Sequence, residues 1–139
     1  KWSDLGSWKE ILLMFDKHKT KYFNKKNTYY RPWGKYTNLF NGKNFLIKEI
    51  FVKSNGILSL QKHFHRSEHW LVTQGRPRIT LNKKFFFKKP NQTIFVPKGA
   101  VHRIQNPNKK PVKIMEAQLG SILKETDIVR YEDVYGRTN

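Results

Sequence analysis

The stretch Gln61-Lys-His-Phe-His-Arg-Ser-Glu-His69 gathers three imidazoles, a carboxylate and an amide oxygen into nine residues. Because side chains alternate along a strand, Gln61, His63 and His65 are predicted to share one face. Such a face offers several donors to a single metal ion. A second polar stretch, Pro97-Lys-Gly-Ala-Val-His-Arg-Ile-Gln-Asn106, lies far downstream. We predict that the two stretches meet in space and hold one divalent metal.

The sequence on either side of these stretches is typical of an all-β domain. Short runs of alternating, β-branched and aromatic residues are separated by turn signals such as Asn41-Gly42, Ser54-Asn55-Gly56 and Lys98-Gly99. Many short strands with regular turns predict a sandwich or a barrel. The predicted strands are Lys35–Phe40, Phe45–Lys53, Leu58–Gln61, His69–Gln74, Arg78–Leu81, Lys84–Phe87, Thr93–Val96, His102–Gln105 and Val112–Gln118.

The two ends of the chain lack this β pattern. Ser7 is positioned to cap a short amphipathic helix over Trp8–Lys17, and the basic, aperiodic residues 18–31 are interpreted as a linker. The more polar end, Ile122–Asn139, is predicted to form a short helix and an extended tail packed on the barrel. The chain is therefore divided into an N-terminal helix and linker at residues 1–30 and a β domain at residues 31–139.

The composition limits the binding partners and the cellular compartment that can be expected. The 139 residues suit a single domain, and the absence of cysteine excludes disulfides and thiolate zinc sites. No run is long and apolar enough to span a membrane and the N-terminus has no signal-peptide pattern, so a cytoplasmic protein without a membrane partner is predicted. The net charge of +18 is spread along the chain without a basic arm, which argues against nucleic acid and fits attraction of a small phosphate ester.

The two polar stretches resemble the paired motifs of the cupin superfamily, whose members fold as a double-stranded β-helix, a jelly-roll-like barrel. The first cupin motif runs Gly, His-x-His, Glu and Gly at fixed spacing, and the second runs Gly, Pro-x-Gly, His and Asn. Fitted by spacing, the first motif selects Gln61, His63, Glu68 and Gly75, and the second selects Pro97, Gly99, His102 and Asn106.

The sequence departs from the cupin pattern in two ways. Asn55 and Asn91 stand where the motifs begin with glycine, and Asn is the residue other than glycine that best tolerates a positive φ angle. Gln61 stands where most cupins have their first His, and its carbonyl oxygen can ligate a hard or borderline divalent ion. The implied metal ligands are Gln61, His63, Glu68 and His102, with positions left open for water or substrate as in a catalytic site.

The resemblance implies one divalent metal ion as cofactor. Zinc is the first expectation, and cobalt, manganese, nickel and iron are the alternatives. Two histidines fall outside the motif spacing: His65, on the predicted face of His63, could serve the substrate, whereas His69 is expected behind the ligands or in the core.

Longer segments are similar to type II mannose-6-phosphate isomerase, a cupin that is usually the C-terminal part of a bifunctional enzyme with mannose-1-phosphate guanylyltransferase. Residues 1–8 resemble a segment near the end of the transferase domain, in which Asp4 would be a magnesium ligand. The Gly-rich nucleotide-binding start of that domain is absent from this sequence, so guanylyl transfer by this chain alone is not expected. The similarity to the isomerase covers roughly residues 31–137 and is carried by Arg31-Pro-Trp-Gly-Lys-Tyr36, Leu58-Ser-Leu-Gln-Lys-His-Phe-His-Arg-Ser-Glu-His-Trp70, Val96-Pro-Lys-Gly-Ala-Val-His-Arg103, Glu116-Ala-Gln118, Asp127-Ile-Val-Arg130 and Tyr135-Gly-Arg137.

The resemblance implies interconversion of mannose 6-phosphate and fructose 6-phosphate, an aldose–ketose isomerisation through an enediol. The reaction needs a metal to polarise the carbonyl, a base for the carbon-bound proton and a cation for the phosphate. His65 and Glu116 are the candidate bases, and Glu116 lies either inside the barrel or at its rim beside a Lys. Lys48 is either a buried cation or a surface residue. The candidate phosphate ligands are Arg130, which we also count with the catalytic groups, and then Lys98, Arg103 and Arg137.

Other functions are compatible with the same residues. The chief alternative is a non-catalytic cupin that binds a metal or a sugar phosphate and is attached to, or regulates, a nucleotidyltransferase. Epimerisation of a nucleotide sugar and metal-dependent oxygenation are also open. Oxygenases, however, generally use more imidazole ligands than remain here, where Gln61 replaces one histidine. Exposed strand edges would allow a homodimer.

Overall fold

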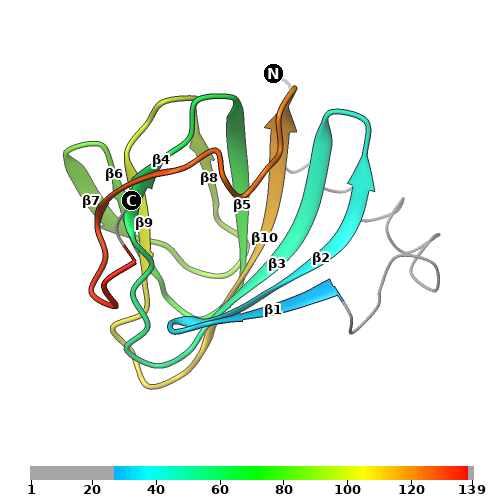
Figure 1. Ribbon diagram of the computed structural model, residues 1–139. Helices are drawn as coiled ribbons and strands as arrows, with labels where there is room; N and C mark the ends of the chain where they lie inside the picture. Colours follow the sequence, from blue (N-terminus) through cyan, green and yellow to red (C-terminus); the bar gives the residue numbers. More distant parts are fainter. Residues whose placement is uncertain (1–26, 138–139) are drawn as a thin grey trace.

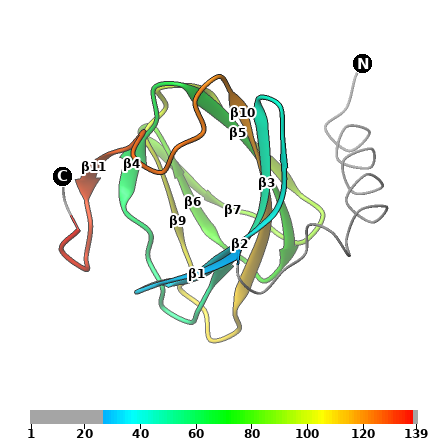
Figure 2. The same ribbon diagram turned by 45° about the vertical axis from the view of Figure 1, so that its right-hand side comes forward.

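The computed structural model describes residues 27–137, which form two antiparallel sheets that face each other across a common interior (Figure 1, Figure 2). The predicted helix over Trp8–Lys17 and the transferase-like residues 1–8 lie outside the described residues. The six-stranded sheet has the order β1-β2-β3-β10-β5-β8, and the five-stranded sheet has the order β11-β4-β9-β6-β7. The strands are β1 (Thr28–Arg31), β2 (Gly34–Gly42), β3 (Phe45–Val52), β4 (Leu60–Lys62), β5 (Arg66–Gln74), β6 (Arg78–Leu81), β7 (Lys84–Phe87), β8 (Thr93–Val96), β9 (His102–Gln105), β10 (Val112–Gly120) and β11 (Val129–Glu132).

The interior between the sheets is apolar at one end and polar at the other. Along β10 the inward-facing Val112 and Ile114 are followed by Glu116 and Gln118, and all four side chains are buried. Burying an apolar side chain contributes about 1.5–3 kcal/mol, so the apolar end offsets the cost of burying charged groups at the other end. The apolar end contains Trp33, Ile50, Val52, Val72, Ile79, Ile104, Val112 and Ile114. The buried polar residues include Lys48, His63, Arg66, Glu68, His102, Glu116 and Gln118.

The strand register brings the two polar stretches together, as the sequence predicts. Gln61 of β4 lies directly opposite His102 of β9 in the five-stranded sheet. In the facing sheet, Glu68 of β5 lies opposite Gln118, and Glu116 lies between Lys48 and Trp70. Residues that are paired in register point to the same side of a sheet, so both sheets direct polar side chains into the same end of the interior.

The predicted turns are confirmed at the positions where the cupin pattern has glycine. Asn55 and Asn91 have φ angles of 63° and 72°, in the left-handed region that Asn tolerates better than other side chains. Gly75 has a φ angle of 83°, and a Cβ there would lie 2.7 Å from the carbonyl oxygen of Pro111. Glycine at this position is therefore required both by the backbone angle and by the close approach of the neighbouring chain.

The structure corrects the predicted ends of the β domain. Thr28–Arg31, interpreted as the end of a linker, forms β1 because its backbone pairs with β2. The segment after β10 contains no helix among the described residues up to 137; instead Val129–Glu132 forms β11 by pairing with β4. Strand β5 begins at Arg66 rather than at His69. The errors at β11 and at the start of β5 have one cause, since pairing with a distant strand leaves no local signal in a short polar segment. No helix among the described residues is long and apolar enough to cross a membrane.

Asn106, the last residue of the second motif, is expected to be a strong determinant of stability. Its buried amide group donates to the carbonyl oxygens of Val52, Lys53 and Lys110 at 2.9–3.2 Å. Replacement by Ala would remove all three hydrogen bonds, and we expect the free energy of unfolding to fall by about 2–4 kcal/mol. The free energy of unfolding can be measured by urea denaturation. In the matched control Asn108→Ala, which loses one exposed hydrogen bond, the loss should stay below about 1 kcal/mol; equal losses in both variants would contradict the prediction.

Candidate functional site

Three side chains that could hold a metal ion meet at the polar end of the interior. His63 follows β4, Glu68 lies on β5 and His102 begins β9, and their ligand atoms all lie within 4.8 Å of one another. His63 Nε2 is 3.2 Å from Glu68 Oε2, and His102 Nε2 is 3.7 Å from Glu68 Oε1. All three side chains are buried. Two imidazoles and one carboxylate form a donor set typical of zinc and other divalent transition metals.

The protonation of the two imidazoles fits a bound metal. His63 Nδ1 lies 2.6 Å from the carbonyl oxygen of Asp127, and His102 Nδ1 lies 2.9 Å from that of Ala100. A carbonyl only accepts, so each Nδ1 carries the proton and each Nε2 presents a lone pair to Glu68. His102 Nε2 has no hydrogen-bond partner among the described residues. A buried acceptor without a partner is costly, and a metal at this point would satisfy it.

The charges around the cluster hold its members in the forms that bind metals. Burial, followed by the charge of Arg66, lowers the pKa of His63 to about 4, which keeps its imidazole neutral. Burial alone would raise the pKa of Glu68, but the surrounding positive charge and hydrogen bonds, those of Arg66 among them, outweigh it and hold the pKa at about 2. A neutral imidazole and an ionised carboxylate are the forms required of metal ligands.

Gln61, the fourth predicted ligand, lies beside the cluster with its amide nitrogen turned toward it. The Nε2 atom is 3.3 Å from His63 Nε2, while Oε1 accepts a hydrogen bond of 2.5 Å from Ser59 Oγ. A half-turn of the amide exchanges its oxygen and nitrogen and would direct the oxygen to the position between the ligands. The residue is therefore within reach of a metal held by His63.

Arg66 is a site residue that the motif spacing did not reveal. Its Nε donates to Glu68 Oε2 at 2.9 Å, and its Nη2 lies 3.1 Å from His63 Nε2. The guanidinium therefore lies against the same atoms that would hold the metal, and its buried Nη1 has no hydrogen-bond partner among the described residues. Extending the predicted strand back from His69 would have found it, since Arg66 then shares a face with Glu68.

Glu116 is an interior carboxylate joined to the cluster through Trp70. The Trp70 indole N–H donates both to Glu68 Oε1 at 3.0 Å and to Glu116 Oε2 at 2.9 Å. Gln118 Nε2 donates to the other oxygen of Glu116 at 2.8 Å. Burial and the nearby charge of Glu68 raise the pKa of Glu116 to about 7, although Lys48 opposes them. The sequence left two positions open for Glu116, inside the barrel or at its rim, and the structure places it inside.

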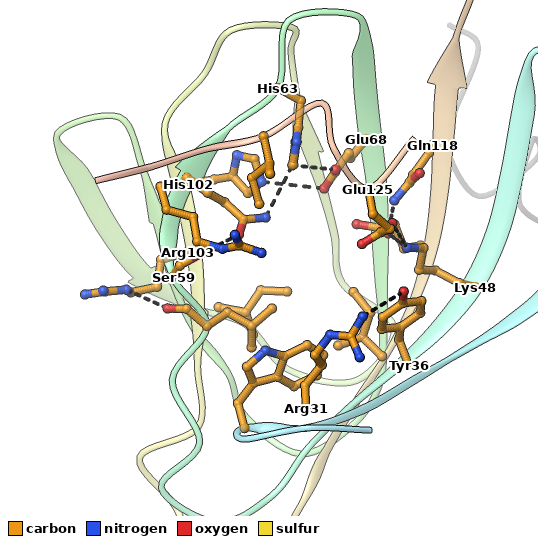
Figure 3. A pocket seen from close by; sticks show the side chains of 18 of the residues that line it. Arg31, Tyr36, Lys48, Ser59, His63, Glu68, His102, Arg103, Gln118 and Glu125 are labelled. Atoms are coloured by element: carbon orange, nitrogen blue, oxygen red, sulfur yellow. Dashed lines mark hydrogen bonds and ion pairs between the residues drawn. The ribbon is translucent and has the colours of Figure 1, made fainter. Parts of the chain in front are cut away.

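A pocket of about 660 Å³, counting the space open to solvent at its mouth, contains these residues. Figure 3 shows His63, Glu68 and His102 at one end of the pocket and Arg31 and Tyr36 at the other. The cations that line it are Arg31, Lys48, Arg66, Arg103, Arg130 and Arg137, and the carboxylates are Glu68, Glu116 and Glu125.

Lys48 is the buried cation rather than a surface residue. Its side chain is 5% exposed, and its Nζ lies 3.1 Å from Glu125 Oε2 and 4.0 Å from Glu116 Oε1. The same ammonium group lies 4.1 Å from the centre of the Tyr36 ring, a cation–π contact. The pocket therefore has a positive charge beside Glu116. Figure 3 shows Lys48, which carries this charge, on the wall formed by the six-stranded sheet.

The four predicted phosphate ligands differ in position. Arg130, Arg103 and Arg137 line the pocket, whereas Lys98 is exposed on a turn and does not. Arg103 donates to the Leu58 carbonyl and to Glu132, and Arg137 is held by Asp133 at 2.7 Å. Arg130 lies in register with Gln61, which in turn lies opposite His102, so these three residues form one row across the five-stranded sheet.

Two predicted histidine positions are wrong. His65 does not share the face of His63, because β4 ends at Lys62 and the chain bends before β5 begins. Its side chain is 49% exposed and pairs with Asp127 at 3.3 Å, and it does not line the pocket. His69 is half-buried on the outer side of β5, where its ring lies 4.8 Å from that of Phe95.

Related sequences are found in bacterial proteins named for alginate biosynthesis, for xanthan biosynthesis and for mannose-1-phosphate guanylyltransferase activity. The family model "Mannose-6-phosphate isomerase C-terminal" matches residues 17–133. The alginate biosynthesis protein AlgA of Pseudomonas aeruginosa is 50% identical over 109 residues, which cover 78% of this chain and 23% of AlgA. The xanthan biosynthesis protein XanB of Xanthomonas campestris is 47% identical over 109 residues (78% and 23%). The mannose-1-phosphate guanylyltransferase ManC of Salmonella typhimurium is 45% identical over 108 residues (78% and 22%). The chain thus spans less than a quarter of the length of these relatives.

Solved structures share the fold. The cupin domain of Cnp3 from Schizosaccharomyces pombe has a TM-score of 0.60 at 21% identity, covering 62% of this chain and 64% of that chain. The capsular polysaccharide assembling protein CapF from Staphylococcus aureus has a TM-score of 0.65 at 14% identity, covering 76% of this chain and 32% of that chain. At such identities the likeness shows the fold alone. The predicted all-β cupin fold is therefore confirmed.

Proposed function

The chain belongs to the family of mannose-6-phosphate isomerase C-terminal domains, and on that premise we propose that it is a metal-dependent isomerase that interconverts mannose 6-phosphate and fructose 6-phosphate. A bound divalent metal, for which zinc is the first candidate, would be held by His63, Glu68 and His102 with Gln61 as a fourth ligand. The metal would supply Lewis-acid polarisation of the substrate carbonyl. Because relatives are named for alginate and xanthan biosynthesis, we propose that the product or substrate serves polysaccharide synthesis.

The observation that carries this proposal is the position of Glu116. It lines the same pocket as the three-ligand cluster but does not belong to it. The hydrogen bonds from Trp70 and Gln118 hold both of its oxygens, so the carboxylate has a fixed place beside the ligands. A carboxylate so placed can take the proton from C2 of the aldose and return it to C1, while the proton of the C2 hydroxyl passes to the C1 oxygen; together the two transfers make up the isomerisation. The ammonium group of Lys48, 4.0 Å from Glu116, stabilises negative charge that develops on the neighbouring substrate oxygens.

The direct test is turnover. Protein freed of metal with a chelator and then loaded with zinc, cobalt, manganese or nickel is mixed with mannose 6-phosphate, and fructose 6-phosphate is followed by a coupled assay. We expect turnover in at least one metal-loaded sample and none in the metal-free sample. Metal binding without turnover in any sample would support the non-catalytic binding module instead.

We assign the phosphate to Arg130, because it stands in one row with Gln61 and His102 and lines the same pocket. Arg130→Ala is expected to raise KM for mannose 6-phosphate by about 10–100-fold with a smaller change in kcat, since hydrogen bonds to a charged group are worth roughly 1.5–3 kcal/mol. Steady-state kinetics measure both constants. Lys98→Ala is the matched control, because this exposed lysine lies outside the pocket and its loss should leave KM unchanged. A KM raised by Lys98→Ala and not by Arg130→Ala would reverse the assignment.

A further inference from the structure

Asp127 directs each of its oxygen atoms at the loop that carries His63. It lies in the connection between β10 and β11, which crosses from one sheet to the other (Figure 2). Its carbonyl oxygen accepts from His63 Nδ1 at 2.6 Å. Its carboxylate oxygens accept from the backbone N–H groups of Phe64 at 3.1 Å and His65 at 3.0 Å. Asp127 is 9% exposed, so these contacts are shielded from water.

The loop needs this support because it lies between strands. Strand β4 ends at Lys62 and β5 begins at Arg66, so residues 63–65 have no strand partner of their own. On the other side of the loop, the backbone N–H of Gly99 donates to the carbonyl oxygen of His63 at 2.9 Å. The backbone of His63 is thus held by the second motif, whereas its ring and the next two residues are held by Asp127.

We infer that Asp127 is a positioning residue for the metal, which sets the tautomer and the direction of His63; this inference rests on the metal site of the proposed function. With its Nδ1–H bound to a fixed carbonyl, the ring presents Nε2 toward Glu68 at 3.2 Å. The carboxylate fixes the place of that carbonyl relative to the loop, since it binds the two residues that follow His63. Groups that orient a histidine ligand in this way tune metal affinity without touching the metal.

Asp133 offers a matched control in the same part of the chain. Its carboxylate also accepts from two backbone N–H groups, those of Tyr135 at 3.2 Å and Arg137 at 2.7 Å. It therefore holds its own turn and makes no contact with the loop of His63. Loss of either carboxylate removes two backbone hydrogen bonds, but only the loss of Asp127 frees a metal ligand.

The test is zinc affinity measured by competition with a chromophoric chelator. Asp127→Ala is expected to bind zinc about 10–100-fold more weakly than the unmodified protein. Asp127→Asn keeps one acceptor and places an amino group against the second N–H, so its affinity should fall in between. Asp133→Ala should keep the affinity of the unmodified protein even though its melting temperature falls. Unchanged affinity in Asp127→Ala would overturn the inference.

A second measurement needs no variant. In the metal-free protein, the imidazole ¹⁵N shifts of His63 should show a proton on Nδ1 and a bare Nε2. A proton on Nε2 would overturn the inference even if Asp127→Ala fails to fold. The two proposals can also fail separately: a protein that binds zinc but shows no turnover with any metal would contradict the proposed function, whereas weaker zinc binding by Asp127→Ala would still support the role of Asp127.

Discussion

Glu116→Gln is expected to lower kcat for the conversion of mannose 6-phosphate to fructose 6-phosphate by about 10²–10⁴-fold, the usual contribution of a positioned general base. Glutamine has nearly the same shape and can still accept from Trp70 Nε1 and remain beside Gln118. It cannot take up a proton from carbon at neutral pH. The change therefore removes the chemistry with little change in the packing of the pocket.

Two measurements make this expectation specific. Metal content and KM should stay close to those of the unmodified protein, because Glu116 is not in the ligand cluster. His65→Gln serves as the matched control, since His65 is the other base that the sequence proposes and it lies outside the pocket. It should keep full activity. If His65→Gln were inactive and Glu116→Gln active, His65 and not Glu116 would be the general base.

His63→Ala is expected to weaken metal binding by more than the roughly 10–100-fold that follows loss of an outer partner, and so to leave the purified protein without metal. The alanine has no donor, and the carboxylate of Glu68 is then left with His102 alone in the cluster. Metal content measured by mass spectrometry should fall from one equivalent to nearly none. Activity should fall with it.

The neighbouring histidine again provides the control. His65→Ala removes an exposed imidazole from the same loop but no member of the cluster, so metal content should be unchanged. The apolar end of the interior is untouched in both variants, and both should remain folded by circular dichroism. A His63→Ala variant with full metal content would show that the ligand assignment is wrong.

Much of the site follows from local sequence. Alternation along short runs predicts most of the strands, and Asn55 and Asn91 mark two tight turns because few other side chains accept positive φ. The spacing of His63, Glu68 and His102 predicts a ligand cluster, and their register brings them within 4.8 Å. The strands and turns can be found in the sequence because each depends on the strand period or on the backbone preference of one residue, whereas the ligand set is implied by the resemblance to the paired cupin motifs.

Other parts of the site depend on which strands become neighbours. Glu116 lies inside because the face of β10 that it shares with Val112 and Ile114 turns toward the other sheet, and Arg66 joins the ligands because β5 begins earlier than its apolar run indicates. His65 faces outward because the chain bends between β4 and β5. The role inferred for Asp127 depends on a contact between residues 64 positions apart. The sequence by itself thus determined the barrel, its turns and the triad of His63, Glu68 and His102. Only the tertiary structure decided which carboxylate, guanidinium and carbonyl surround that triad, since contacts across the interior leave no periodic signal along the chain.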